Sequence, residues 1–149
     1  MPPEVAALKS PGVQTVGWVP DLAPEYERAR VVIAPLRFGA GVKGKVAEAI
    51  EHAVPVVGTS MALEGMDLEH GADVLCADTA EEFADAVVRL LTDDSAWRSM
   101  AGRGQARLME QFGPARAREV LEGVLSHPES SRHASTLAQS LGDDLEVAI

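Results

Sequence analysis

The chain has 149 residues, of which 46% are hydrophobic and 24% are charged, a composition that is typical of a globular domain and excludes a disordered chain. Thirteen basic residues against 23 acidic ones give a formal net charge of −10, which argues against nucleic acid as a general partner because duplex binding needs a basic face. The single cysteine, Cys76, excludes an internal disulfide framework and a cysteine-rich zinc site.

The first predicted elements alternate between strand and helix. Val13–Val19 is rich in β-branched residues and predicts a strand. Asp21–Arg30 predicts a helix, with Asp21 as its N-cap and Pro24 in its first turn. The continuous apolar run Val31–Ala34 then favours a strand that is buried on both faces of a sheet.

A glycine-rich loop, Gly39–Gly44, separates that strand from the next helix. Lys45–His52 predicts this helix from its apolar spacing. Its positions at core spacing are Val46, Ala49, Ile50 and Ala53. Two further apolar runs, Val54–Gly58 and Asp73–Ala77, predict strands.

The second half of the chain is predicted to be helical. Thr79 and Glu82 form a capping box that begins a helix. The apolar positions on one face of this helix are Phe83, Val87, Leu90 and Leu91. Asp93 or Asp94 caps the next helix, and Pro114 begins the last one.

This alternation predicts an α/β fold, a parallel Rossmann-like sheet with helices on both faces. Residues 1–125 are expected to form this unit, and residues 126–149 a tail that is flexible or partly helical. Ligands of such sheets bind outside the carboxyl ends of the strands. We therefore expect function in the loops that follow Gly17, Ala34, Gly58 and Ala77.

Charge is distributed unevenly along the chain. Five basic residues and no acidic one lie from Arg28 to Lys45, whereas ten acidic residues and one arginine lie from Glu64 to Asp94. Arg28 and Arg30 are interpreted as a solvated basic surface.

Three other cations are different because they flank glycines between a buried strand and a helix. These cations are Arg37, Lys43 and Lys45. Exposed backbone N–H groups at such a junction, together with the helix dipole, attract phosphate.

Two short motifs match this loop. Gly39–Gly44 fits the dinucleotide fingerprint G-x-G-x-x-G, and Gly39–Lys45 fits the first seven positions of a P-loop. The P-loop next needs a hydroxyl for Mg²⁺, where this chain has Val46. The fingerprint should follow its strand directly and precede an acidic residue at the end of the next strand, but Leu36–Phe38 intervene and the next strand ends in Gly58–Ser60. Both motifs therefore fit poorly.

Five segments, in order and at the expected distances, are more specific. They are Gly17–Asp21, Ala29–Pro35, Lys45–Ile50, Pro55–Thr59 and Glu64–Met66. Together with the helices after Thr79, they resemble the donor-binding half of GT-B glycosyltransferases, the group typified by family-4 retaining enzymes. The resemblance covers about residues 13–125, so the predicted fold is part of the C-terminal domain of such an enzyme.

The resemblance implies a hexosyltransferase of polysaccharide or glycoconjugate biosynthesis. Such an enzyme transfers a sugar from a nucleotide diphosphate sugar with retention of configuration, and it uses no metal and no other cofactor. An N-terminal domain, which is missing from this chain, would bind the acceptor and supply the catalytic groups. We therefore assign no catalytic residue within the chain and expect it to be inactive by itself.

The family motif has two glutamates eight positions apart that contact the donor. Glu48 matches the second, which holds the ribose hydroxyls; the alternative is an exposed helix residue paired with Lys45. The first glutamate falls at Ala40, but a subset of the family has a Pro-Leu-Arg…Gly-x-Gly-x-Lys loop there. Arg37 and Lys43 are then candidates for the diphosphate or sugar. The glycines that would let the backbone approach the phosphates are Gly39, Gly41 and Gly44.

The resemblance also places residues around this loop. Trp18 and Val19 would border the nucleobase, with an ordinary core position as the alternative for Trp18. Thr59 and Glu64 lie at the carboxyl end of another strand, and a simple loop acid is the alternative for Glu64. Ala53 stands where the family has glycine at a helix end. The left-handed backbone conformation of such a helix end costs alanine on the order of 1 kcal/mol relative to glycine.

Two other functions remain open from the residues alone. One is a P-loop-type ATP-binding enzyme, and the other is a non-catalytic α/β binding module whose glycine loop is only a turn. In each case we expect a cytoplasmic protein that is at most peripheral to the inner face of the membrane. No apolar run approaches the roughly 20 residues that cross a bilayer, and Met1–Glu4 does not resemble a signal peptide.

Overall fold

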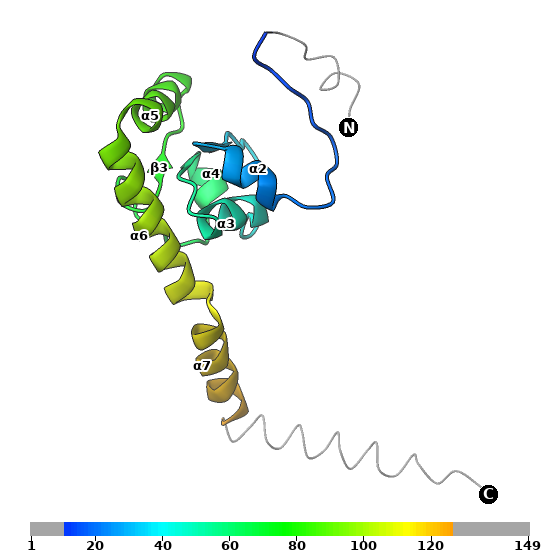
Figure 1. Cartoon of the computed structure of the whole chain (residues 1–149). Helices are drawn as coiled ribbons and strands as arrows, with labels where there is room; N and C mark the ends of the chain where they lie inside the picture. Colours follow the sequence, from blue (N-terminus) through cyan, green and yellow to red (C-terminus); the bar gives the residue numbers. More distant parts are fainter. Residues whose placement is uncertain (1–10, 127–149) are drawn as a thin grey trace, which may run out of the picture.

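The computed structural model describes residues 11–126 (Figure 1). Its elements in chain order are α2 (Ala23–Arg28), β1 (Val32–Ala34), α3 (Gly44–Glu51), β2 (Val56–Gly58), α4 (Ser60–Leu63), β3 (Leu75–Cys76), α5 (Ala80–Thr92), α6 (Asp94–Phe112) and α7 (Pro114–Leu125). The predicted tail lies outside the described residues apart from Ser126. Within residues 11–126, no helix has both the length and the apolar character that crossing a membrane requires.

The three strands form one parallel sheet in the order β1-β2-β3. Val32 is paired with Val56, and Val57 with Leu75. Because all strands run in the same direction, their carboxyl ends meet at one edge of the sheet. The predicted parallel α/β fold is confirmed.

Helices cover both faces of this sheet, as predicted (Figure 1). The alternation along β2 shows why, since Val56 and Val57 are both fully buried but belong to two different cores. The Val56 core contains residues of α2, α3 and α4, and the Val57 core contains residues of α5. Helix α6 contributes to both, with Leu108 in the first and Met100 in the second.

The predicted strand at Val13–Val19 is wrong. This segment has no regular secondary structure, and Val13 and Val16 are about half exposed. In Figure 1 it runs apart from the sheet towards α2. β-branched residues favour extended backbone, but a strand also needs a neighbour that pairs its N–H and C=O groups. No described strand supplies that pairing.

Three burial predictions also fail at the margins of the sheet and its helices. Ile33 is 52% exposed, so β1 is buried on one face only. This strand lies at an edge of the described sheet, where α5 packs on β2 instead. Leu91 is 49% exposed in the last turn of α5, and Ala53 is only half-buried because it follows α3.

The helix termini agree with the local sequence signals. Thr79 and Glu82 form the predicted capping box of α5, and Asp93 caps α6 by accepting hydrogen bonds from two backbone N–H groups. Asp21 accepts a hydrogen bond from Ala23 N at 3.0 Å, although the N-cap position itself is Leu22. The caps of α5 and α6 form as predicted because they involve residues only two or three positions apart. The prediction of Asp21 as the N-cap of α2 is wrong by one position.

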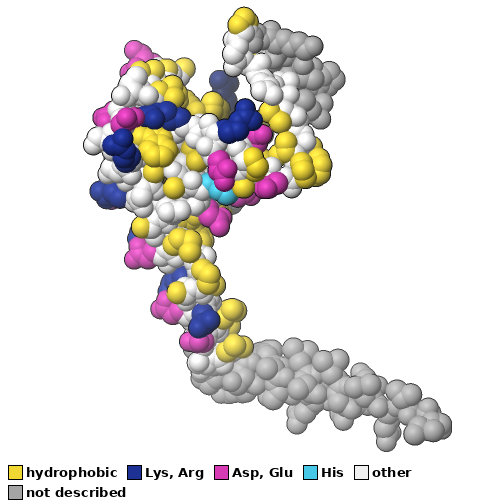
Figure 2. Space-filling model, viewed as in Figure 1, with side chains coloured by type: hydrophobic (Ala, Val, Ile, Leu, Met, Phe, Trp, Pro, Cys, Tyr) yellow, Lys and Arg dark blue, Asp and Glu magenta, His cyan; other side chains and the backbone are white. Residues whose placement is uncertain are grey.

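Helix α7 continues beyond the end of α6 and extends away from the rest of the domain (Figure 1), and none of its residues is buried. Figure 2 shows apolar side chains along this part of the molecule. The half-exposed or more exposed residues at the end of α6 and along α7 are Met109, Phe112, Val120, Leu121, Val124 and Leu125.

The sequence suggested that Arg30 is a solvated surface cation, but this interpretation is wrong. Arg30 links the start of β1 to the corner between α5 and α6. Its Nε donates to the Leu90 carbonyl at 3.1 Å, and its guanidinium forms an ion pair with Asp94. Trp97 Nε1 donates to the Arg30 carbonyl at 2.6 Å, and the guanidinium carbon lies 5.7 Å from the centre of the Trp97 ring. Hydrogen bonding to Arg30 lowers the pKa of Asp94.

The Arg30–Asp94 pair predicts a pH-dependent contribution to stability. The native state favours the charged carboxylate more than the unfolded chain does, so the contribution is present above about pH 4 and is lost as the pH falls through the lowered pKa of Asp94. Urea unfolding of the protein and of Asp94→Asn should therefore differ at pH 7 and converge towards pH 3. Arg30→Met also loses the hydrogen bond to the Leu90 carbonyl, so it should stay less stable than the protein at both pH values while its deficit shrinks towards pH 3. A difference between the protein and Asp94→Asn that stays constant from pH 7 to pH 3 would contradict the prediction.

Ala53 has a left-handed backbone, with φ of 55°. Its N–H donates to the Ile50 carbonyl at 2.9 Å, and Val54 N–H donates to the Ala49 carbonyl at 2.9 Å. These two bonds form a Schellman motif after the C-cap His52. The left-handed conformation expected from the family is therefore present, with an alanine in it.

Ala53→Gly should stabilise the protein by about 1 kcal/mol because it relieves the left-handed strain. The measurement is the free energy of unfolding in urea. The matched control is Ala47→Gly within α3, where glycine should instead destabilise by roughly 0.5–1 kcal/mol. A loss of stability in Ala53→Gly would show that the strain is negligible.

Candidate functional site

The glycine loop lies at the carboxyl end of β1 and leads directly into α3. Gly39 and Gly41 have φ values of 146° and 69°, in the region that favours glycine. At position 39 a side chain would also meet Lys43, whose Cε lies 3.2 Å from where a Cβ would stand. The two glycines therefore let the loop turn and let the Lys43 side chain cross it.

The amino end of α3 has no internal partner for its first N–H groups. Its N-cap is Lys43, which provides no side-chain cap, and its first turn contains no acidic residue. The N–H groups of Val46 and Ala47 both bond the Lys43 carbonyl. Within residues 11–126, the N–H groups of Gly44 and Lys45 make no hydrogen bond. Such a helix end is a favourable place for an anion.

Lys43 is the cation nearest to this helix end along the loop. Its Nζ donates a hydrogen bond to the carbonyl of Gly41, so the side chain folds back over its own loop. This contact joins a charged donor to a neutral acceptor. A phosphate oxygen would accept the same hydrogen bond and would also carry a charge opposite to that of the ammonium group.

Glu48 lies one turn further along α3 and does not pair with Lys45 among the described residues. Its Oε2 accepts a hydrogen bond from the Tyr26 hydroxyl at 3.2 Å. Its Oε1 lies 3.9 Å from where a Cβ on Gly44 would stand, so the carboxylate reaches towards the first turn of the helix. The site therefore brings together Lys43, Gly44 and Glu48.

Tyr26 is a site residue that the sequence prediction missed. It lies on α2, is 9% exposed, and its ring stacks on His52 with ring centroids 5.1 Å apart. Burial raises the pKa of its phenol, and the charge and hydrogen bond of Glu48 raise it further. The only sequence signal was an aromatic residue within an amphipathic helix, which does not by itself indicate a polar contact.

The hydroxyl of Thr59 is already used within the fold. It donates to the Leu36 carbonyl at 2.6 Å and accepts from Ala62 N at 3.2 Å, which caps α4. Glu64 is exposed and precedes Gly65, where a Cβ would lie 3.7 Å from Val42. The loop that carries Glu64 is thus adjacent to the glycine loop.

Other predicted residues do not join this cluster. Arg37 lines a separate pocket of about 320 Å³ at the same edge of the sheet. The other residues around that pocket are Pro35, Thr59, Asp78, Thr79, Ala80, Phe83 and Ala84. Trp18 is 86% exposed, so a core position for it is wrong, and Trp18 and Val19 lie on the segment that runs apart from the sheet in Figure 1.

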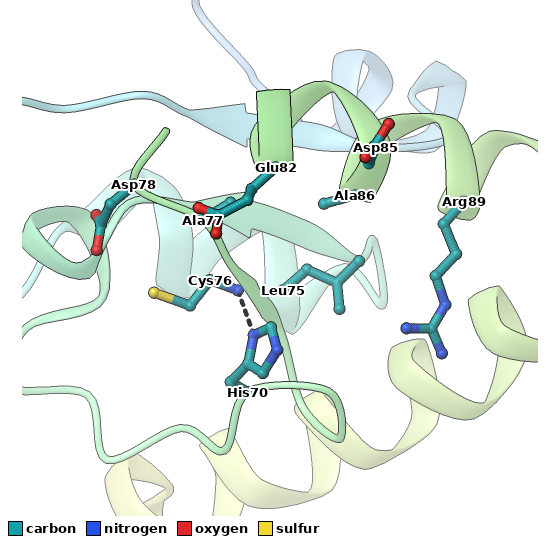
Figure 3. Close-up of a pocket in the computed structure, with 9 residues that line it drawn as sticks. All are labelled: His70, Leu75, Cys76, Ala77, Asp78, Glu82, Asp85, Ala86 and Arg89. Atoms are coloured by element: carbon teal, nitrogen blue, oxygen red, sulfur yellow. Dashed lines mark hydrogen bonds between the residues drawn. The ribbon is translucent and has the colours of Figure 1, made fainter. Parts of the chain in front are cut away.

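A larger pocket of about 410 Å³ lies between β3 and α5 (Figure 3). Among its lining residues, the Cys76 N–H donates a hydrogen bond to His70 Nδ1 at 2.9 Å (Figure 3). Burial, then Asp78 and Glu82, raise the pKa of the Cys76 thiol, so this sulfur is a poor nucleophile. The carboxylates of Asp78, Glu82 and Asp85 outnumber the one arginine that lines the pocket, Arg89, which disfavours an anionic ligand there.

Two observations bear on the short motifs. Val46, which stands where a P-loop needs its hydroxyl, is fully buried in the Val56 core and cannot face a ligand. Among residues 11–126, no three His, Cys, Asp or Glu side chains gather closely enough to hold a metal ion.

The loop, the sheet and α5 lie within one stretch of the chain that matches a known family. Residues 1–93 match the model of the family described as glycosyl transferases group 1. No curated protein matches the chain at a significant level. Since the match covers more than half of the 149 residues, the chain belongs to the group 1 glycosyl transferases.

Proposed function

We propose that this chain forms the donor-binding part of a hexosyltransferase that uses a nucleotide diphosphate sugar. The observation that carries the proposal is the amino end of α3, whose Gly44 and Lys45 N–H groups are free within the described residues and open onto the glycine loop. A diphosphate satisfies such groups and gains from the helix dipole. Transfer is proposed to retain the configuration of the sugar and to need no metal.

The loop would supply the positive charge that a departing diphosphate needs. Lys43 can exchange the neutral Gly41 carbonyl for a phosphate oxygen, and the helix end adds fixed partial charge. Catalysis would then come from positioning and from stabilising the leaving group. Acceptor binding and the catalytic groups are assigned to a preceding domain.

Glu48 would hold the ribose of the nucleotide. An ionised carboxylate only accepts hydrogen bonds, so its two oxygens suit the two hydroxyls of a ribose diol. Glu48 lies one helical turn from the free N–H groups of α3, and its Oε1 faces Gly44. One nucleoside diphosphate could then place its ribose on Glu48 and its diphosphate on the glycine loop.

The proposal predicts selective, metal-independent nucleotide binding. Backbone amide shifts are measured with UDP, GDP, ADP and ATP, with and without Mg²⁺. We expect shifts across residues 39–48 for one nucleoside diphosphate, weakened about tenfold or more in Lys43→Ala because a hydrogen bond to a charged group is lost. Binding of ATP only with Mg²⁺ would favour a P-loop-type enzyme instead. No response to any of the four would favour a non-catalytic module.

Gly44→Ala should remove this binding without unfolding the protein. The nearest atom to the added methyl is Glu48 Oε1 at 3.9 Å, so the methyl fits within the protein. The same methyl would occupy space that a phosphate needs when it approaches the helix end. The matched control is Gly102→Ala in α6, where nothing lies within 4 Å of the added Cβ. Binding by Gly44→Ala that equals binding by Gly102→Ala would refute the proposed phosphate position.

A further inference from the structure

Glu48 is an exposed side chain, and such side chains sample several rotamers. One contact restrains it among the described residues, the hydrogen bond from the Tyr26 hydroxyl at 3.2 Å. These two residues are 22 positions apart and belong to α2 and α3. The orientation of this carboxylate therefore depends on a second helix.

Tyr26 is well suited to impose that orientation because it is itself held rigidly. It is 9% exposed and belongs to the same core as Val46 and Ala49 on α3. Its ring stacks on His52, with an angle of 20° between the ring planes. Glu48 and His52 are four positions apart on one face of α3, so the tyrosine contacts this face at two successive turns.

The two oxygens of the Glu48 carboxylate point to different neighbours. Oε2 lies 3.2 Å from the Tyr26 hydroxyl, nearer than the Lys45 carbonyl at 3.5 Å, and is the charged one of these two acceptors. Oε1 faces Gly44, at the amino end of α3. Each carboxylate oxygen can accept more than one hydrogen bond, so the tyrosine leaves acceptor capacity free for a ligand. A carboxylate that is already oriented loses less conformational entropy when a ligand binds.

We propose that Tyr26 is a positioning residue that holds Glu48 ready for the ribose diol of the donor nucleotide. This inference rests on the proposed function, because it assigns the ribose to Glu48. It adds that the selectivity for ribose depends on a residue of α2 that touches Glu48 and not the ligand.

The first experiment tests the contact without any ligand. The chain contains one tyrosine, so the ultraviolet titration of phenol reports Tyr26 alone. Glu48→Gln should lower the pKa of Tyr26, because the carboxylate charge raises it, while burial keeps it above the ordinary value. Glu51→Gln, on an exposed residue of the same helix, should leave the titration unchanged. An identical titration in the protein and in Glu48→Gln would overturn the proposal.

The second experiment tests the effect on ribose. Dissociation constants are measured on the full chain for whichever of UDP, GDP or ADP binds, and for its 2′,3′-dideoxy analogue. The ratio is the dissociation constant of the dideoxy analogue divided by that of the ribonucleotide. It should fall about three- to tenfold in Tyr26→Phe, which corresponds to the loss of one hydrogen bond. Tyr26→Phe keeps the ring and its stacking on His52, so the fold is preserved.

Two comparisons separate positioning from a general structural effect. Lys43→Ala should weaken both nucleotides equally and leave the ratio unchanged. In Glu48→Gln the ratio should fall, and adding Tyr26→Phe should lower it no further. An unchanged ratio in Tyr26→Phe would overturn the proposal while leaving the donor site intact. Absence of all nucleotide binding, with a normal response of the phenol to Glu48→Gln, would instead overturn the proposed function and the ribose role with it.

Discussion

The burial of one face of α3 is the constraint on which the candidate site depends. Val46, Ala49 and Ile50 are at most 2% exposed and anchor this helix against β1 and β2. Because the helix cannot rotate without exposing them, its amino end is fixed at the carboxyl edge of the sheet. The glycine loop, the free N–H groups and Glu48 all take their positions from that anchoring.

The same packing explains why polar groups of distant segments meet. Helix α2 contributes Tyr26 to the core that α3 helps to form, so its hydroxyl emerges beside Glu48. Helix α6 contributes to both cores and packs against both α3 and α5. Arg30 and Asp94 close the opposite corner, where β1 begins and α6 begins. The site is therefore supported by helices from separate parts of the chain.

The sequence by itself determined the features that depend on neighbouring residues. The capping box of α5 and the cap of α6 require particular residue types only two or three positions apart. Continuous apolar runs located β1 and β2, and apolar spacing located α3, whose Val46, Ala49 and Ile50 are buried. The ordered motifs from residue 17 to residue 66 indicated the glycosyltransferase family, and the family match over residues 1–93 agrees.

Only the tertiary structure decided which elements have partners. Val13–Val19 has the composition of a strand but no described neighbour, and Ile33 lies half-exposed at an edge of the described sheet. The contact between Tyr26 and Glu48 spans 22 positions and is set by how α2 and α3 pack on one face of the sheet. Local sequence carries information over a few residues, whereas strand pairing and helix packing depend on the positions of residues far apart in the chain.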